Sequence, residues 1–199
     1  MRKIPCLFER DFTDRRRPVL LNTITPGCEW VVFSEGRATR KRDGTACMVL
    51  AGVLYKRYDA KRGKTPPPGA IPCTPAPDPA TGHWPHWVAV SADNPADVWH
   101  LAARDDAFSR FPYALPDGTY ELCGPRINAN HEGLSDHRFF AHGLEALDGA
   151  PREFDRLRDY LAANPIEGIV WHHPDGRMAK IRRADYWLPW PVAGERNPG

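Results

Sequence analysis

Lys41 stands two residues before an acidic side chain and three before a glycine, in the stretch Lys41-Arg42-Asp43-Gly44. An apolar run over residues 46–50 follows directly and predicts a β-strand. A neutral lysine amine is a nucleophile, and a glycine beside it lets the backbone approach a phosphate closely. Charged β-turns have the same composition, with Asp43-Gly44 as the turn. The stretch alone therefore leaves a nucleophile and a turn as alternatives.

Four further charged side chains are expected on or beside strands. Glu121 lies within one expected strand, and Glu167 directly precedes another. Lys180 and Arg182 alternate along the last strand, so both are expected to point to one face. Because unpaired buried charges are costly, this pattern indicates a polar cleft between sheets. Each side chain taken singly also fits a solvent-exposed strand edge or a loop.

Short strands joined by rigid loops are expected to position these side chains. The chain contains 21 prolines, which disfavour long helices. Strands are expected at residues 30–33, 47–50, 53–58, 87–90, 119–123, 168–171 and 178–181, with tight turns at 51–52 and 174–176. Helices are expected at 96–108, after Asn94-Pro95, and from Pro151 to before Pro165. Residues 60–80 have no hydrophobic periodicity and are expected to form a loop.

The overall composition is that of an ordinary globular protein. Of the 199 residues 42% are hydrophobic and 26% charged, and the formal net charge is +2. We expect a single domain over residues 1–199, with its core at about 19–190. A net charge of +2 excludes a basic nucleic-acid coat, so any nucleic-acid contact must come from local basic patches.

The cysteine pattern indicates free thiols. There are five cysteines with no Cys-x-x-Cys spacing, namely Cys6, Cys28, Cys47, Cys73 and Cys123. No apolar run approaches the length of a membrane span, and the histidines show no zinc-site spacing. We expect a reduced, cytoplasmic protein without membrane contact.

Taken in chain order, the charged stretches resemble the covalent nucleotidyltransferase superfamily, which comprises ATP-dependent DNA and RNA ligases and mRNA capping enzymes. They are Lys-x-Asp-Gly at 41–44, a strand glutamate before Gly-Pro at 121–125, Glu-Gly-Ile-Val at 167–170 and Lys-Ile-Arg at 180–182. Residues 40–47, 55–59 and 120–128 look most like the small ATP-dependent 5′-3′ RNA ligases of the vertebrate RNA ligase 1 type. The resemblance spans about residues 39–190.

The resemblance implies an α+β fold, with antiparallel sheets around a cleft and a few flanking helices. This is the nucleotidyltransferase, or ligase adenylation, domain. Many ligases carry an added oligonucleotide-binding (OB) domain. About seventeen residues follow Arg182 here, so we expect none.

The same resemblance implies RNA joining through a lysyl-AMP intermediate. Lys41 would attack the α-phosphate of ATP, AMP would pass to an RNA 5′-phosphate, and a 3′-hydroxyl would displace it. An amine attacks only when neutral, and cations beside it favour that state. The implied cofactors are ATP and Mg²⁺ or Mn²⁺, whose preferred ligands are oxygens. The implied partner is RNA with 5′-phosphate and 3′-hydroxyl ends, and no obligate protein partner is evident.

Roles carry over residue by residue. The implied catalytic residues are Lys41, Lys180 and Arg182, and the implied nucleotide-binding residues are Thr39, Arg40, Lys41, Arg57, Glu121, Glu167, Lys180 and Arg182. In the family, Glu121 would bond the ribose, Arg57 the nucleotide or its ribose, and Lys180 the α-phosphate. Glu167 would hold the metal.

Two positions depart from the family pattern. Arg182 stands where the family often has a second lysine, and Arg40 stands where related RNA ligases often carry glutamate. An arginine keeps the charge of a lysine but presents a planar fork. Lys56 begins a similar stretch, but Ala60 replaces the glycine, so Lys41 is the expected nucleophile.

Local basic patches are the expected RNA contacts. Candidates are Arg15, Arg16 and Arg17, and Lys61, Arg62 and Lys64 in the loop, with Trp84 and Trp87 as possible stacking or core residues. Two other functions fit the sequence. One is a related transferase, either a DNA ligase or a guanylyltransferase, and the other is a nucleotide- or RNA-binding protein that lacks the chemistry.

Overall fold

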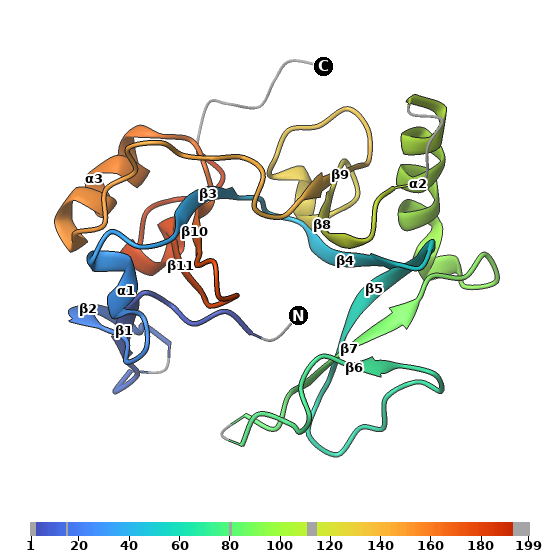
Figure 1. Ribbon diagram of the computed structural model, residues 1–199, viewed down its shortest axis with the longest axis horizontal. Coiled ribbons are helices and arrows are strands. Elements are labelled where there is room, and N and C mark those ends of the chain that lie inside the picture. The colour runs from blue at the N-terminus through green and yellow to red at the C-terminus, as the bar shows by residue number, and fades with distance from the viewer. Residues whose placement is uncertain (1–2, 15, 80, 111–114, 193–199) are drawn as a thin grey trace. The chain divides into compact units, whose positions relative to one another are not determined.

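The computed structural model describes residues 3–14, 16–79, 81–110 and 115–192. The chain divides into two compact units, which are described separately below. The central unit is built from Asp43–His142, and the terminal unit from Ile4–Arg42 together with Gly143–Pro198 (Figure 1). The chain therefore passes between the units after residue 42 and after residue 142.

A three-stranded antiparallel sheet forms the frame of the terminal unit. Its strand order is β11-β10-β3, with β3 at Arg37–Lys41, β10 at Gly168–His172 and β11 at Met178–Arg182. Further backbone pairs cover both outer edges. Leu7 N donates to Lys180 O (2.7 Å) beside β11, and Arg40 N donates to Glu145 O (2.8 Å) beside β3.

One face of this sheet packs into the core of the terminal unit. Ile169, Trp171 and Ile181 are fully buried there, together with Leu157 and Leu161. Because side chains alternate along a strand, Lys180 and Arg182 point to the other face, as the sequence predicted. The elements packed around the sheet are β1 (Phe8–Asp11), β2 (Val19–Ile24), α1 (Glu29–Val32), α3 (Phe154–Ala163) and η3 (Arg183–Tyr186).

The central unit is built on a six-stranded antiparallel sheet in the order β6-β7-β5-β4-β8-β9. Cys47, Leu122 and Ala103 lie in its core, which α2 covers. The strands are β4 (Thr45–Leu50), β5 (Val53–Ala60), β6 (Ile71–Pro72), β7 (Trp84–Ala89), β8 (Gly118–Cys123) and β9 (Arg138–Ala141). The helices are η1 (Pro95–Asp97), α2 (Val98–Arg110) and η2 (Asn128–Asn130).

The predicted α+β class with antiparallel sheets and few helices is confirmed. The hairpins β4–β5 and β10–β11 are also confirmed. The Asn94 side chain caps the start of the helix at Ala96 N (3.1 Å), as its position suggested. The helix expected from Pro151 begins at Phe154, and the expected loop 60–80 contains the short strand β6.

The strand predicted at residues 30–33 is wrong. These residues lie largely in α1, where the neighbouring side chains Trp30 and Val31 are both buried. Neighbours in a strand point to opposite faces, whereas one helical turn can direct both into a core. A four-residue apolar run does not distinguish the two structures.

All five cysteines are free thiols, and Cys28, Cys47 and Cys123 are buried, as predicted. No helix among the described residues is long and apolar enough to cross a membrane. The division into two units does not test the expectation of one domain over residues 1–199, which stays a prediction.

Candidate functional site

Lys41 is the last residue of β3 and forms an ion pair with Glu167. Its ammonium also donates to Arg42 O at 3.2 Å. Glu167 directly precedes β10, and the register that sets Gly168 opposite Lys41 brings its carboxylate beside the lysine. Both side chains are largely withdrawn from solvent, with exposed fractions of 22% for Lys41 and 12% for Glu167. Two residues 126 positions apart thus form one charged pair.

Lys180 and Arg182 lie on the same face of this sheet. Burial, and after it the nearby charges of Arg182 and Lys41, together lower the pKa of Lys180 to about 8. Among the described residues, no hydrogen-bond acceptor lies against the Lys180 ammonium. A lysine in this setting indicates a local excess of positive charge, which an anion would relieve.

Gly168 separates the Lys41 and Arg182 side chains. It pairs with Lys41 on one side and with Arg182 on the other, so the three residues form a row across β3, β10 and β11. A Cβ at this position would lie 2.2 Å from Ile181 O, so no side chain fits. The middle of the row therefore carries no side chain, and a cationic side chain lies on each side of it.

Asp185 and Arg10 were not predicted from the sequence and extend this group. The Asp185 carboxylate accepts from Arg182 N (2.9 Å), Arg182 Nη2 (2.9 Å) and Arg10 Nη2 (2.7 Å). Asp185 is placed three residues after Arg182, so its spacing gave a weak local signal. Arg10 is 175 residues away from Asp185, and no sequence pattern connects the two.

Arg42 fixes the end of β3 to the neighbouring segment. Its guanidinium holds Glu145 through two hydrogen bonds, of which Nε to Oε2 is 2.7 Å. These bonds lower the pKa of the Glu145 carboxyl. The backbone bond from Arg40 N to Glu145 O adds to the attachment. The residue that precedes Asp43 is thus held firmly in the terminal unit.

Thr39 lies on the same face of β3 as Lys41, in one row with Val170 and Lys180, whereas Arg40 is not brought into this group. The Thr39 side chain is buried, and its hydroxyl contacts Val170 O and His172 Nε2, both at 3.1 Å. Arg40 pairs with the buried Ile169, on the face of β3 opposite Lys41. Their assignment to nucleotide binding stays a prediction.

Glu121 and Arg57 share a face of the central sheet. Ala46 pairs with Glu121, and the neighbouring Cys47 pairs with Lys56, so Arg57 and Glu121 flank Ala46 in one row. Arg57 Nε donates to the Asp59 carboxylate at 2.9 Å. The row thus places a carboxylate on β8 and a guanidinium on β5, with β4 between them and both on one face of the sheet.

His142 holds the Glu121 carboxylate in place. Its Nε2 lies 2.9 Å from Glu121 Oε2, and its Nδ1 lies 3.0 Å from Thr119 Oγ1. The backbone supports this arrangement, because His142 N donates to Thr119 O at 3.0 Å. A carboxylate held by a fixed imidazole ring presents a fixed acceptor to a ligand.

Asp43 and Gly44 anchor the beginning of β4 within the central unit. The Asp43 carboxylate contacts Asn128 Nδ2 and His131 Nδ1, both at 2.7 Å. A Cβ on Gly44 would lie 2.3 Å from Leu122 O, so the glycine is required by close packing against β8. The strands on either side of the stretch, β3 and β4, belong to different sheets, so it is not the turn of a hairpin.

The alternative lysine has a structural partner. Lys56 forms an ion pair with Asp97, whose carboxylate is fully buried and also accepts from Ser91 N at 3.0 Å. Breaking such a pair would leave a buried charge. The pairing therefore gives Lys56 a structural role in the central unit.

Comparison with known proteins shows a similarity to RNA ligase 1. The family model described as RNA ligase 1 matches residues 108–197. RNA ligase 1 of Danio rerio is 31% identical to this chain over 147 residues, which cover 60% of this chain and 45% of that protein. RNA ligase 1 of Pongo abelii is 31% identical over 146 residues, covering 59% and 45%, and that of Rattus norvegicus is 30% identical with the same coverage.

The chain thus spans about half the length of the curated relatives it matches. The predicted resemblance to the RNA ligase 1 family is confirmed.

Proposed function

We propose that this RNA ligase 1-like chain joins RNA 5′-phosphate and 3′-hydroxyl ends with ATP, through a lysyl-AMP intermediate, and acts in RNA repair. The observation that carries the proposal is the group of Lys41, Glu167, Lys180 and Arg182 on three adjacent strands. The similarity to RNA ligase 1 supports an RNA substrate. The fold proposed for the two sheets is that of a nucleotidyltransferase.

Lys41 is the proposed nucleophile. Its Nζ forms a bond to the α-phosphorus of ATP, the bond from that phosphorus to the bridging oxygen breaks, and pyrophosphate leaves with the bonding electrons. The ammonium loses one proton to solvent before the attack and a second one after it, so the phosphoramidate nitrogen keeps one hydrogen. Lys180 and Arg182 stabilise the charge that grows on the phosphate oxygens.

Glu167 is the residue proposed to hold Mg²⁺ or Mn²⁺. Among the described residues no group of three or more His, Cys, Asp or Glu side chains is gathered for a metal. One carboxylate fits Mg²⁺ nonetheless, because this ion often takes one or two carboxylates and completes its shell with phosphate oxygens and water. When bound, the cation would neutralise phosphate charge and share the Glu167 carboxylate with Lys41.

Glu121 and Arg57 are proposed to bind the nucleoside part of ATP. Glu121, fixed by His142, is an acceptor for ribose hydroxyls, and Arg57 in the same row is a donor to the nucleotide. Thr39 and Arg40 remain candidates by resemblance alone. We also propose a cytoplasmic location, which rests on the free thiols.

Basic side chains outside these groups are proposed to hold RNA. Arg16, Lys61, Arg62 and Lys64 are exposed, whereas Arg15 lies outside the described residues. The Arg17 guanidinium lies over the Trp187 ring at 5.4 Å. Trp87 is 4% exposed and belongs to the core, so of the two predicted stacking residues only Trp84 is partly accessible.

Sealing of a nicked or tailed RNA tests the proposal. The full chain with ATP and Mg²⁺ or Mn²⁺ should convert RNA with 5′-phosphate and 3′-hydroxyl ends into a longer strand. GTP in place of ATP, or DNA in place of RNA, should give much less product. A preference for GTP would indicate a guanylyltransferase and a preference for DNA ends a DNA ligase. Nucleotide binding without any covalent product would indicate a binding protein.

A further inference from the structure

Arg10 belongs to the same charged group as the Lys41 site, although it comes from the N-terminal strand. It lies on β1, and its Nη2 and the Nη2 of Arg182 both bond the same oxygen of Asp185, at 2.7 and 2.9 Å. The shared carboxylate is 3% exposed, so a buried anion holds both guanidinium groups in place. The Arg10 side chain itself keeps an exposed fraction of 24%.

The charges of this group do not balance. Four cationic side chains, Lys41, Lys180, Arg182 and Arg10, face two carboxylates, Glu167 and Asp185. Asp185 is shared by two arginines, and Glu167 is occupied by Lys41. The lowered pKa of Lys180 reflects burial and the same excess. An excess of positive charge on preorganised donors suits a multiply charged anion.

The cations follow one another in a fixed order across the sheet. Across the sheet, Lys41 on β3 is followed by Gly168 and then by Arg182 on β11. Outside β11 comes the N-terminal segment, because Leu7 N bonds Lys180 O there, and Arg10 follows three residues later. Arg10 is therefore the member of the group on the far side of Arg182 from the nucleophile.

We propose that Arg10 binds the pyrophosphate portion of ATP, a role that rests on the proposed lysyl-AMP chemistry. In an in-line displacement the leaving group departs on the side opposite the attacking amine. With the α-phosphate at Lys41 and Lys180, the β- and γ-phosphates extend toward Arg182 and Arg10. Arg10 then stabilises the pyrophosphate as the bond to the α-phosphorus breaks and, in reverse, positions pyrophosphate for attack on lysyl-AMP.

The reverse reaction separates this role from a role in RNA binding. The full chain is loaded with AMP on Lys41 and freed of nucleotide. It is then given either inorganic pyrophosphate, which returns AMP as ATP, or RNA with a 5′-phosphate, which accepts AMP without any triphosphate. The variants are Arg10→Ala and Arg10→Lys, and the control is Arg156→Ala, which removes an exposed arginine on α3 of the same unit.

We expect Arg10→Ala to slow pyrophosphate-driven loss of AMP at least tenfold and to raise the KM for ATP by a similar factor, while transfer to RNA changes less than twofold. Arg10→Lys should recover part of the loss, and Arg156→Ala should match the unaltered chain. Equal slowing of both reactions, or slowing of the RNA reaction alone, would overturn the proposal and place Arg10 in folding or in RNA binding. If the unaltered chain takes up no AMP, the proposed chemistry itself fails, which is a separate result.

Discussion

At the scale of single residues, the site is defined by how each charge is balanced. Glu167 neutralises Lys41, and Asp185 is shared by Arg182 and Arg10, but Lys180 forms no ion pair among the described residues. Its buried charge is therefore costly to the fold. A phosphate would supply the missing anion. The lowered pKa of Lys180 and the proposed binding of ATP phosphates therefore have the same cause, an excess of positive charge.

Replacing Lys180 by methionine should stabilise the fold near neutral pH and abolish the chemistry. The folded-state pKa is about 8, below the reference value of about 10.4 for an unfolded chain. Between these values the unfolded chain holds more protons, so stability rises with pH in this window. The cost of the buried charge is fully present below pH 8 and gone above about pH 10.4. Urea unfolding at pH 7 and at pH 10 measures this cost as a difference in the free energy of unfolding.

The stability advantage of Lys180→Met over the unaltered chain should be larger at pH 7 than at pH 10. An advantage that does not change with pH would mean that Lys180 is not strained by its charge. The variant also reports on function, because labelling of Lys41 with AMP should fall at least a hundredfold without the α-phosphate cation.

The sequence identified the charged residues of the terminal unit but not all of their partners. Lys41, Glu167, Lys180 and Arg182 were chosen because their order along the chain matched a known chemistry, and the sheet register brings them together. Arg10 belongs to no such ordered pattern in the sequence. Its position depends on the N-terminal segment pairing with β11, a long-range contact that leaves no local pattern.

At the scale of elements, two glycines determine how closely strands approach the charged groups. Gly168 separates the Lys41 and Arg182 side chains, and Gly44 lets the start of β4 pack against β8 beside Glu121. Neither has the positive φ that usually explains a glycine. Both are required by contact with a neighbouring backbone carbonyl.

Gly44→Ala should therefore destabilise the chain by about 1–3 kcal/mol, the usual cost of forcing a methyl group into a packed site. The added Cβ would meet Leu122 O at 2.3 Å, so β4 or β8 must shift. Gly118→Ala is the matched control, since it lies on β8 and its Cβ has no neighbour closer than 3.8 Å. Thermal or urea unfolding measures the stability of both variants, and equal stabilities would refute the packing argument.

Elements bounded by clear turns were predictable, and those defined by distant partners were not. Ala51-Gly52 and Pro174-Asp175-Gly176 gave the two hairpins. Residues 30–33 lacked such a boundary, and their helical turn is imposed by packing of Trp30 and Val31 into the terminal core. The segment that covers the free edge of β3 through Glu145 was likewise invisible to a local pattern.

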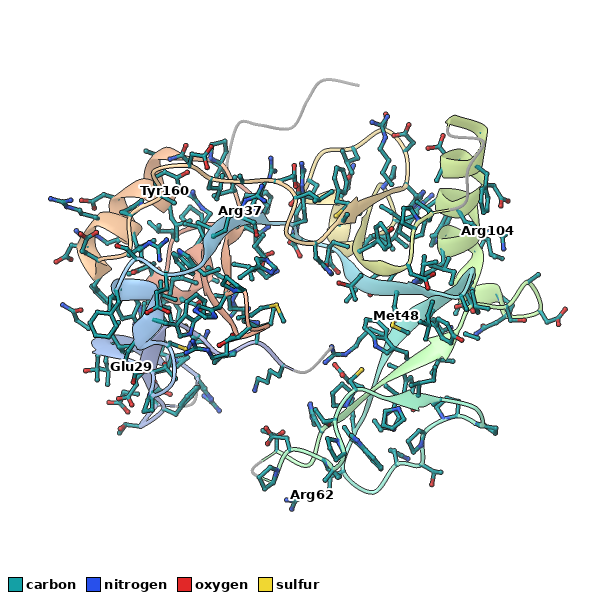
Figure 2. All side chains as sticks on the ribbon, in the orientation of Figure 1. Glu29, Arg37, Met48, Arg62, Arg104 and Tyr160 are labelled. Carbon is teal, nitrogen blue, oxygen red and sulfur yellow. The ribbon has the colours of Figure 1, made fainter. Side chains whose placement is uncertain are left out.

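At the scale of the whole molecule, the low net charge leaves RNA affinity to particular patches. A formal charge of +2 gives no general attraction to a polyanion. The loop after β5 carries Lys61, Arg62 and Lys64, which are all exposed. Arg62 is labelled in Figure 2. Because these three lie close together in the sequence, they form the densest group of exposed cations in that loop.

Replacing Lys61, Arg62 and Lys64 together by alanine should weaken RNA binding and lower its salt dependence. Each lost phosphate contact reduces the slope of log K against log salt by about 0.7 for single strands, so three reduce it by about 2. The control removes three exposed arginines from helices, Arg104, Arg156 and Arg158, for the same change in net charge. If both triple variants lose the same affinity, the loop has no special role.

The most direct test of the account is the mass of the chain after incubation with ATP and Mg²⁺ or Mn²⁺. The unaltered chain should gain the mass of one AMP, and peptide mapping should place it on Lys41, the lysine paired with Glu167. Lys41→Ala should gain nothing, and Lys3→Ala, which removes an exposed lysine, should gain as much as the unaltered chain. A folded chain that gains no AMP, or that carries it on a lysine other than Lys41, would contradict the account.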